Sequence, residues 1–324
     1  MAEDRKILVT GIKPTGKLHI GNYFGAIKPF LDIERQYHSI IFVADLHALT
    51  TQKNSKELSS DISDIVIDFL TLGIDPKKTI IFKQSDIPEV TTLAWIFSCL
   101  TPMPYLKRAH AYKDAEAKDK EINVGVFSYP LLMAADILIQ DADVVPVGLD
   151  QKQHLEITRE TGRKFNQTFG KTFKLPEPLI LKEVATVPGT DGRKMSKSYK
   201  NTIGLFAELP EIKEAVMKIP TDSKGVQDPK DPKKCKVFGL HKIFGGRELK
   251  KLEERYKKGR IGYQESKELL IKKIDKFIKP LRDRRARIEK KQKVSDILEA
   301  GRKIIKKSAE EKLAAVLEKV GSKT

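Results

Sequence analysis

The order of strand-like and helix-like segments is the feature that most constrains the fold of this chain. Three short apolar runs have the length and β-branched composition of buried strands, at 6–12 (KILVTGI), 39–45 (SIIFVAD) and 79–86 (TIIFKQSD). The segments between them, at 24–35 and 57–72, place apolar residues three and four apart, as amphipathic helices do. This alternation predicts a parallel sheet with helices on its faces.

The pattern changes near residue 200. A helix-like segment at 128–140 and a strand-like run at 143–148 continue the alternation, and beyond residue 200 strand-like runs stop. Helical periods then follow at 208–219, 265–279 and 295–320. We therefore predict an α/β fold, with a Rossmann-like, doubly wound parallel sheet and an all-α C-terminal domain.

We place the domain boundary at residue 200, with a Rossmann-like domain over 1–200 and a helical domain over 201–324. The last helix is a candidate to pack back on the first domain. Residues 1–200 hold 27 Lys and Arg and 25 Asp and Glu, which leaves residues 201–324 with 34 of the 61 basic and 19 of the 44 acidic residues. A lysine-rich background would spread the excess evenly, so the asymmetry favours a nucleic acid as the partner of the C-terminal part.

Hydropathy and cysteine usage indicate a cytoplasmic protein with no membrane partner. No stretch approaches the ~18 consecutive apolar residues of a membrane span, and the chain opens with charged residues followed by a strand-like run. Cys99 and Cys235 have no metal-ligand spacing, and a buried thiol is predicted for each. Trp95, the only tryptophan, is assigned to the core.

A loop punctuated by Gly11, Gly16 and Gly21 follows the first strand, in GIKPTGKLHIGN. Ligands of open α/β sheets bind at the carboxyl ends of the strands, and glycine lets a nucleotide approach the backbone closely. The spacing is neither the dinucleotide fingerprint nor a P-loop. The glycines alone are equally consistent with a tight strand-to-helix turn.

Two short motifs give this chain a specific family resemblance. The sequence His19-Ile20-Gly21-Asn22 resembles the HIGH signature of class I aminoacyl-tRNA synthetases, in its HIGN form, and KMSKS at 194–198 is similar to their second signature. The stretches 128–138 (SYPLLMAADIL) and 144–160 closely resemble the bacterial-type tryptophanyl enzymes of this family rather than their tyrosyl relatives.

The resemblance implies amino-acid activation by ATP with Mg²⁺, and transfer of the aminoacyl group to a tRNA for tryptophan. His19, Lys194 and Lys197 are the implied catalytic residues, because their charges and N–H groups can stabilise the transferring phosphates. The implied ATP-binding residues are Gly11, Lys13, His19, Gly21, Asn22, Gly148, Asp150, Lys194, Met195, Ser196, Lys197 and Ser198.

The amino acid is expected to bind along one predicted helix. Tyr129, Met133 and Asp136 recur at spacings of four and three, and so share a face. An indole ring offers one N–H donor and no acceptor, which suits one acceptor in an apolar slot. By resemblance Asp136 accepts that N–H, Met133 packs on the ring, and Tyr129 with Gln151 holds the ammonium and carboxylate of L-tryptophan. A salt-bridged or capping carboxylate is the alternative for Asp136.

Several positions depart from the family pattern or carry no assignment. Lys13 stands where many bacterial members have Gln, and Leu149 where Glu is usual. No lysine of 107–124 is assigned to ATP. His154 lies four residues after Asp150, and we assign it to the polar face of a helix over 151–165 because no third metal ligand is suitably spaced.

The resemblance also implies a homodimer in which one tRNA spans both subunits, with the basic segment 279–293 on the anticodon arm. Some relatives carry an iron–sulfur cluster in the helical domain. Only Cys235 matches their cysteines, with Tyr263 and Ser266 near the other expected positions. We therefore expect no cluster.

Three other functions remain open at this point. A tyrosyl enzyme would share the fold and signatures but needs polar partners for a phenol hydroxyl, which the apolar LLMAAD context does not favour. A catalytically silent tRNA-binding paralogue would show degenerate signatures, and both are intact here. A small-molecule nucleotidyltransferase would lack KMSKS and the basic C-terminal helices.

Overall fold

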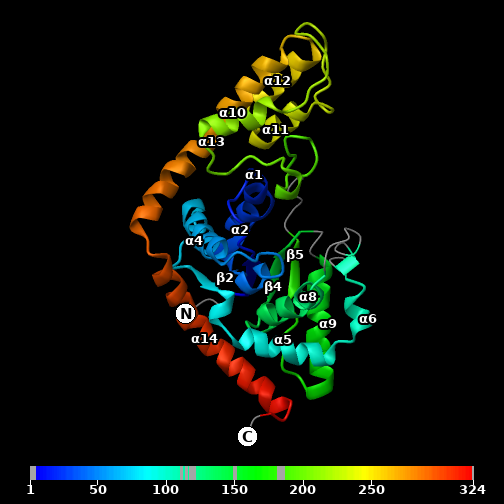
Figure 1. Cartoon of the computed structure of the whole chain (residues 1–324), viewed down its shortest axis with the longest axis vertical. Coiled ribbons are helices and arrows are strands. Elements are labelled where there is room, and N and C mark those ends of the chain that lie inside the picture. The colour runs from blue at the N-terminus through cyan, green and yellow to red at the C-terminus, as the bar shows by residue number, and fades with distance from the viewer. Residues whose placement is uncertain are drawn as a thin grey trace. The chain divides into compact units, whose positions relative to one another are not determined.

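The computed structural model describes residues 5–109, 112–113, 116, 122–148, 152–180 and 187–322, and it divides into two compact units (Figure 1). Unit 1 comprises Met1–Gly16, Phe30–Lys182 and Gln292–Thr324, and unit 2 comprises Lys17–Pro29 and Glu183–Lys291. Both units therefore combine segments that are far apart in the sequence. The boundary at residue 200 stays a prediction from composition.

Unit 1 is built on a five-stranded parallel sheet with the order β3-β2-β1-β4-β5. In register, Val9 pairs with Ile40, and Ile40 in turn with Ile80. The prediction of a parallel α/β fold with a helical C-terminal region is confirmed. The strands are β1 (Ile7–Ile12), β2 (His38–Val43), β3 (Thr79–Lys83), β4 (Val144–Val147) and β5 (Glu177–Ile180).

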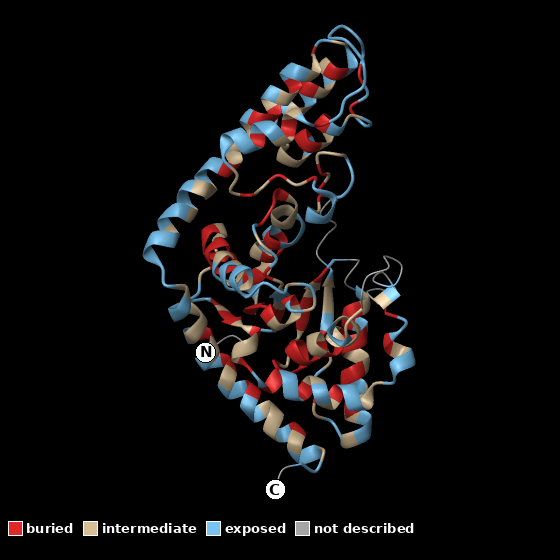
Figure 2. Ribbon diagram, viewed as in Figure 1, coloured by how far each residue is buried: buried red, intermediate tan, exposed pale blue. Residues whose placement is uncertain are grey.

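Helices pack against this sheet, and Figure 2 shows buried residues on the strands and on the helices around them. The shared apolar core includes Phe42 and Val145 of the strands and Phe97 and Leu131 of the helices. The helices are α2 (Lys28–Ile33), which contains the passage from unit 2 to unit 1, α3 (Asp45–Ala48), α4 (Ser55–Leu72), α5 (Glu89–Leu100), α6 (Met103–Leu106), α8 (Val124–Leu138), α9 (Lys152–Phe169) and α14 (Val294–Lys319), with short 3₁₀ turns η2 (Glu34–Gln36) and η3 (Gln84–Asp86).

The sequence sets the ends of α4 by ordinary capping. The Asn54 side chain accepts hydrogen bonds from the N–H groups of Lys56 and Glu57, which would otherwise lack helical partners. Gly73 ends the helix with a φ of 108°, a left-handed conformation that favours glycine.

The C-terminal helix α14 packs on β3 and α5. At Gly301 the approach is so close that an added Cβ would lie 1.9 Å from the carbonyl oxygen of Ile81. Farther along the helix, Ile305 is buried in the core and Lys306 forms an ion pair with Glu89 of α5. Glycine at position 301 therefore permits the contact between α14 and the backbone of β3.

Unit 2 is helical. Its helices α10 and α11 pack on α13, and Phe24, Phe244 and Phe277 form an aromatic cluster with ring centroids 5.5–6.0 Å apart. The helical elements are α1 (Ile20–Asn22), the π-helical turn η1 (Tyr23–Ile27), η5 (Lys197–Tyr199), α10 (Leu209–Met217), α11 (Lys236–Phe244), α12 (Glu248–Lys257) and α13 (Tyr263–Lys291).

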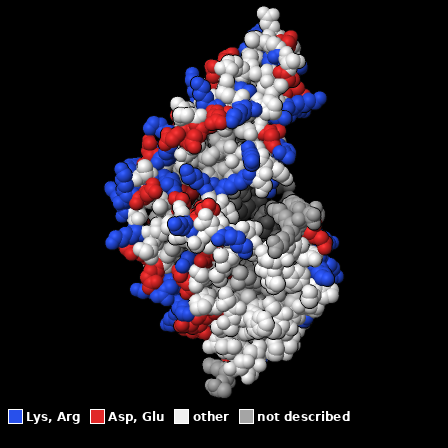
Figure 3. Space-filling view, viewed as in Figure 1, with Lys and Arg blue, Asp and Glu red and all other residues white. Residues whose placement is uncertain are grey.

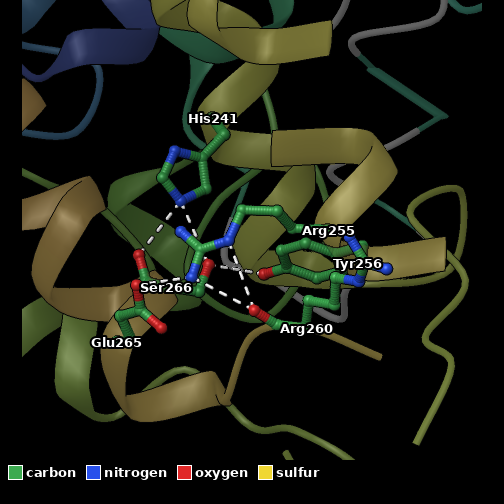
Figure 4. Close-up of polar contacts among 6 residues, drawn as sticks. All are labelled: His241, Arg255, Tyr256, Arg260, Glu265 and Ser266. Atoms are coloured by element: carbon green, nitrogen blue, oxygen red, sulfur yellow. Dashed lines mark hydrogen bonds and ion pairs between the residues drawn. The ribbon is translucent and has the colours of Figure 1, made fainter. Parts of the chain in front are cut away.

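A polar network links α11, α12 and α13 (Figure 4). The hydroxyl groups of Tyr256 and Ser266 are 2.5 Å apart, and Nε2 of His241 lies 3.0 Å from the carbonyl oxygen of Ser266. Arg255 donates to Glu265 at 2.7 Å and to the carbonyl oxygen of Arg260. The buried hydroxyls and Nε2 of the imidazole thus hydrogen-bond within this network, whereas Nδ1 of His241 has no partner among the described residues.

Two sequence assignments on α5 are wrong. Trp95 is 71% exposed and the thiol of Cys99 is exposed, whereas both were predicted to be buried. The helix packs through Val90, Leu93 and Phe97, and a helix that buries this stripe turns the opposite one outward. Within the described ranges, no helix is both long and apolar enough to cross a membrane.

We expect Gly301→Ala to lower the free energy of unfolding by about 1–3 kcal/mol, because the added methyl group forces α14 away from β3. Thermal unfolding followed by circular dichroism measures the effect. Gly25→Ala is the control, because a Cβ at this helical glycine meets nothing within 4 Å. Equal stabilities of the two variants would contradict the packing role of Gly301.

Candidate active site

The HIGN residues form the start of α1 in unit 2, where His19 is the N-cap. Nδ1 of His19 accepts a hydrogen bond from the Asn22 N–H at 3.2 Å, and Oδ1 of Asn22 accepts from the His19 N–H at 3.0 Å. Burial, together with the positive charge of Lys197, lowers the pKa of His19 to about 4. The imidazole is therefore neutral at pH 7 and carries its proton on Nε2, where it can donate to an anion.

The structure brings the two signatures together within unit 2. The N–H of Gly21 lies 3.3 Å from Sδ of Met195, and Met195 is buried. The N–H of Ile20 donates to the carbonyl oxygen of Ile203 at 3.0 Å. The segment 187–204, which we call the KMSKS loop, thus lies against the HIGN turn, and its Lys194, Lys197 and Ser198 are exposed.

One buried asparagine shapes the KMSKS loop. Oδ1 of Asn201 accepts from the Ser196 N–H at 2.8 Å, and Nδ2 donates to Asp191 at 2.7 Å and to the carbonyl oxygen of Lys194 at 3.1 Å. The hydrogen bond from Asn201 is the main reason why the pKa of Asp191 falls to about 2. A Cβ at Gly189 would lie 2.2 Å from Nδ2, so glycine is needed there.

Three more predicted ATP positions, Gly11, Lys13 and Gly148, lie in or soon after strands of unit 1. Gly11 lies in β1, and an added Cβ would lie 2.3 Å from the Phe42 ring. Nζ of Lys13 donates to the hydroxyl groups of Thr50 and Thr51 at 3.1 and 2.8 Å, and burial lowers the pKa of this ammonium. Gly148 directly follows β4.

Asp150 and Gln151, two other predicted binding residues, lie outside the described residues. So do parts of the segment 107–124.

Asp136 is a buried carboxyl on α8, with 7% of its surface exposed. Its Oδ2 accepts a hydrogen bond from Nε2 of Gln84 at 2.7 Å. Burial raises the pKa of Asp136 well above its usual range. Met133, one turn earlier on α8, is half-buried against the core. Asp136 and Met133 thus lie one turn apart on α8, and their assignment to an indole site stays a prediction.

Tyr129 contacts two histidines, and one of them corrects a sequence assignment. The Tyr129 hydroxyl lies 2.6 Å from Nε2 of His154, and the His47 ring stacks on the Tyr129 ring at 4.7 Å. His154 is 8% exposed, so its assignment to a polar helix face is wrong. It lies on the side of α9 that packs on α8. Burial, Lys13 and His154 together lower the pKa of His47 to about 4.

Sequence reasoning missed both His47 and Gln84. Gln84 directly follows β3, and His47 lies in α3, which begins two residues after β2. Their positions just beyond the carboxyl ends of strands are the signal that could have found them.

In the helical region where some relatives carry a cluster, Cys235 is half-buried and its thiol lies 3.8 Å from the Tyr256 hydroxyl. Ser266 bonds to the same hydroxyl, and the Tyr263 hydroxyl donates to Asp222 at 2.8 Å. The expectation that no cluster binds stays a prediction.

Comparisons with known proteins point to one family. The model of the tRNA synthetases class I (W and Y) matches residues 1–279. The chain is 46% identical over 317 residues to the tryptophan–tRNA ligase of Fusobacterium nucleatum, covering 97% of each chain. It is 43% identical to that of Campylobacter jejuni, over 97% of this chain and 99% of the relative.

A solved structure agrees with these sequence matches. The crystal structure of the Campylobacter jejuni tryptophanyl-tRNA synthetase complexed with ADP and tryptophan superposes with a TM-score of 0.90 at 43% identity. The superposition covers 97% of this chain and 99% of that one.

We expect Asn201→Ala to slow ATP–pyrophosphate exchange by about 10²-fold, because the lysines of the KMSKS loop lose their fixed positions. Asn166→Ala is the matched control. Its amide likewise holds a loop, through hydrogen bonds of 2.8 Å to the backbone of Thr172 and Phe173, but in unit 1. Exchange that falls equally in both variants would show a general loss of stability instead.

Proposed function

Because the chain belongs to the class I tRNA synthetases of the tryptophan and tyrosine group, we infer that it is a tryptophan–tRNA ligase. It activates L-tryptophan with ATP to tryptophanyl-adenylate and pyrophosphate. It then transfers the tryptophanyl group to the 3′ end of the tRNA for tryptophan and releases AMP. Similarity to tryptophan–tRNA ligases over nearly the whole chain is the observation that carries this conclusion.

The amino-acid site that we propose is the apolar face around Asp136. Its carboxyl accepts the indole N–H, and Met133 packs on the ring. Tyr129 and Gln151 hold the ammonium and carboxylate end. Burial of Asp136 supports this role, because a buried acceptor left without its donor disfavours amino acids that lack the N–H group.

The phosphate chemistry is assigned to the two signatures. The neutral His19 donates from Nε2, and Lys194 and Lys197 supply positive charge to the pyrophosphate that leaves. Met195 brings the KMSKS loop close to Gly21, beside Asn22, and the hydroxyl groups of Ser196 and Ser198 are additional donors. The contact between Gly21 and Met195 supports a joint action of both segments.

In unit 1, Gly11 offers exposed backbone to the nucleotide near the end of β1, and Lys13 is a second cation for its phosphates. Gly148 and Asp150, at the carboxyl end of β4, take the ribose. ADP in the Campylobacter jejuni structure supports an adenine nucleotide as ligand.

Mg²⁺ binds together with ATP. Among the described residues, no three His, Cys, Asp or Glu side chains gather to hold a metal ion, and the KMSKS loop is cationic. These residues fit a magnesium ion that is held by the phosphates and by water rather than by a protein cage. The ion supplies charge neutralisation on the phosphates when bound.

The basic C-terminal part contacts the tRNA. Residues 279–293 contain KPLRDRRARIEKKQK, most of which lies in α13. Arginine and lysine on one helix bind phosphates, so the anticodon arm is the proposed ligand of this segment. The reaction belongs to protein synthesis, which supports a cytoplasmic location.

A homodimer is the proposed assembly, and α5 is its proposed interface. Residues 90–106 carry no charged side chain, although 32% of the chain is charged. Trp95 is 71% and Met103 60% exposed, and Figure 3 shows few charges on the face over α5. An exposed uncharged patch of this kind fits a second copy of the chain.

We expect ATP–pyrophosphate exchange that depends on tryptophan and is absent when tyrosine is supplied alone. In the proposed site the buried Asp136 carboxyl is the acceptor for the indole N–H and Met133 contacts the ring. The smaller phenol ring of tyrosine would lose part of that apolar contact. Exchange with tyrosine instead would assign the tyrosyl activity. If neither amino acid supports exchange, the silent tRNA-binding function becomes the better conclusion.

Trp95→Glu should convert the dimer to a monomer in analytical ultracentrifugation, because the interface would bury an unpaired charge. The sole tryptophan also reports association, since burial shifts its emission to shorter wavelength. Val226→Glu is the control, because Val226 is 60% exposed in unit 2. A dimeric Trp95→Glu variant, or a monomeric wild type, would refute the assignment.

A further inference from the structure

Gln84 is a buried polar residue to which the proposed reaction assigns no role. It lies in η3, directly after β3, and its side chain has no exposed surface. Nε2 donates to Oδ2 of Asp136 at 2.7 Å, and Oε1 accepts from the backbone N–H of His47 at 3.2 Å. The amide therefore joins the turn after β3 to α3 and to α8.

These two contacts define which end of the amide faces the carboxyl group. A backbone N–H can only donate, so the carbonyl oxygen of Gln84 must point to His47 and the amino group to Asp136. Gln84 thus presents a donor to Oδ2, and Oδ2 must accept. Among the residues that the structure describes, none donates to Oδ1, which is the carboxyl oxygen we assign to a ligand.

The groups around Asp136 make the Gln84 amide important for the protonation state of the carboxyl. Asp45 is also buried nearby, where its Oδ1 accepts from the Ser85 N–H at 3.0 Å. Burial and the charge of Asp45 favour a protonated Asp136, while the hydrogen bond from Gln84 opposes protonation. A protonated Oδ1 would present a hydrogen to the indole N–H instead of a lone pair.

We propose that Gln84 is a positioning residue for amino-acid selection: its amide holds the Asp136 carboxyl so that Oδ1 accepts the indole N–H. This inference rests on the role proposed for Asp136. A merely structural role would make Gln84 equally important for every amino acid that fits the pocket. A positioning role makes it important only for a ligand with a ring N–H.

The experiment compares tryptophan with its benzothiophene analogue, in which sulfur replaces the ring N–H. In ATP–pyrophosphate exchange, Gln84→Met should lower kcat/KM for tryptophan by about 10- to 100-fold, as expected for a lost hydrogen bond to a charged acceptor. The loss should appear in KM with little change in kcat, because the N–H contact is equal in ground and transition states. The kcat/KM for the analogue should be nearly unchanged.

Two further variants keep the test decisive. Gln84→Asn retains the amide but shortens its reach by one methylene group, and it should show the same selective loss if Gln84→Met does not fold. Gln140→Met is the matched control. Gln140 is also a buried glutamine near α8, and its Nε2 has no partner among the described residues.

Asp136→Ala separates this inference from the proposal on which it rests. If Asp136→Ala abolishes the preference for tryptophan over the analogue and both Gln84 variants retain it, Gln84 has no positioning role and the Asp136 site stands. If Asp136→Ala also retains the preference, both assignments are overturned. Equal losses for the two amino acids in the Gln84 variants would show a structural role only.

Discussion

The parallel direction of the five strands determines where unit 1 can carry chemistry. Because every strand ends at the same edge, residues that follow different strands meet there. Gly11 is the penultimate residue of β1, Asp45 follows β2, Gln84 follows β3 and Gly148 follows β4. Asp136 reaches the same group of side chains from α8, through its hydrogen bond with Gln84. The sheet thus gathers residues that are up to 137 positions apart in sequence without a long loop.

Within unit 2, the arrangement of charge favours phosphate. His19 stays neutral because it is buried and because Lys197 is near, so the exposed lysines of the KMSKS loop are the positive groups and His19 is a neutral donor. Asn201 and Asp191 fix the loop backbone by hydrogen bonds within the loop. The lysine side chains are consequently carried by a backbone that is already ordered, which lowers the entropic cost of using them on a ligand.

The fold and both signatures could be predicted because their information is local. Strands such as β2 show as β-branched runs, and the HIGN and KMSKS motifs are contiguous. Contacts across the sequence could not be predicted in this way. The face of α5 that carries Trp95 and the burial of His154 depend on which helix packs beside them, and periodicity alone gives no partner. The four-residue strand β5 was missed, since GKTFKLPEPLI has no clear strand period.

The segments that make up the two compact units also depend on contacts between distant parts of the sequence. A change in composition at residue 200 suggests one boundary, whereas α14 packs on β3 and the HIGN turn pairs with Gly204. Both contacts are long-range, and each depends on close approach at a glycine or a backbone hydrogen bond rather than on a sequence period.

The buried polar groups of unit 1 lower the free energy of unfolding, and a role in ligand binding would account for their presence. A buried carboxyl such as Asp136 costs free energy that one hydrogen bond from Gln84 only partly offsets. An apolar residue of similar size would pack there without that cost. The same holds for the paired hydroxyl and imidazole of Tyr129 and His154. If Asp136 binds the indole as proposed, this free-energy cost is what keeps an acceptor for the ring N–H inside the fold.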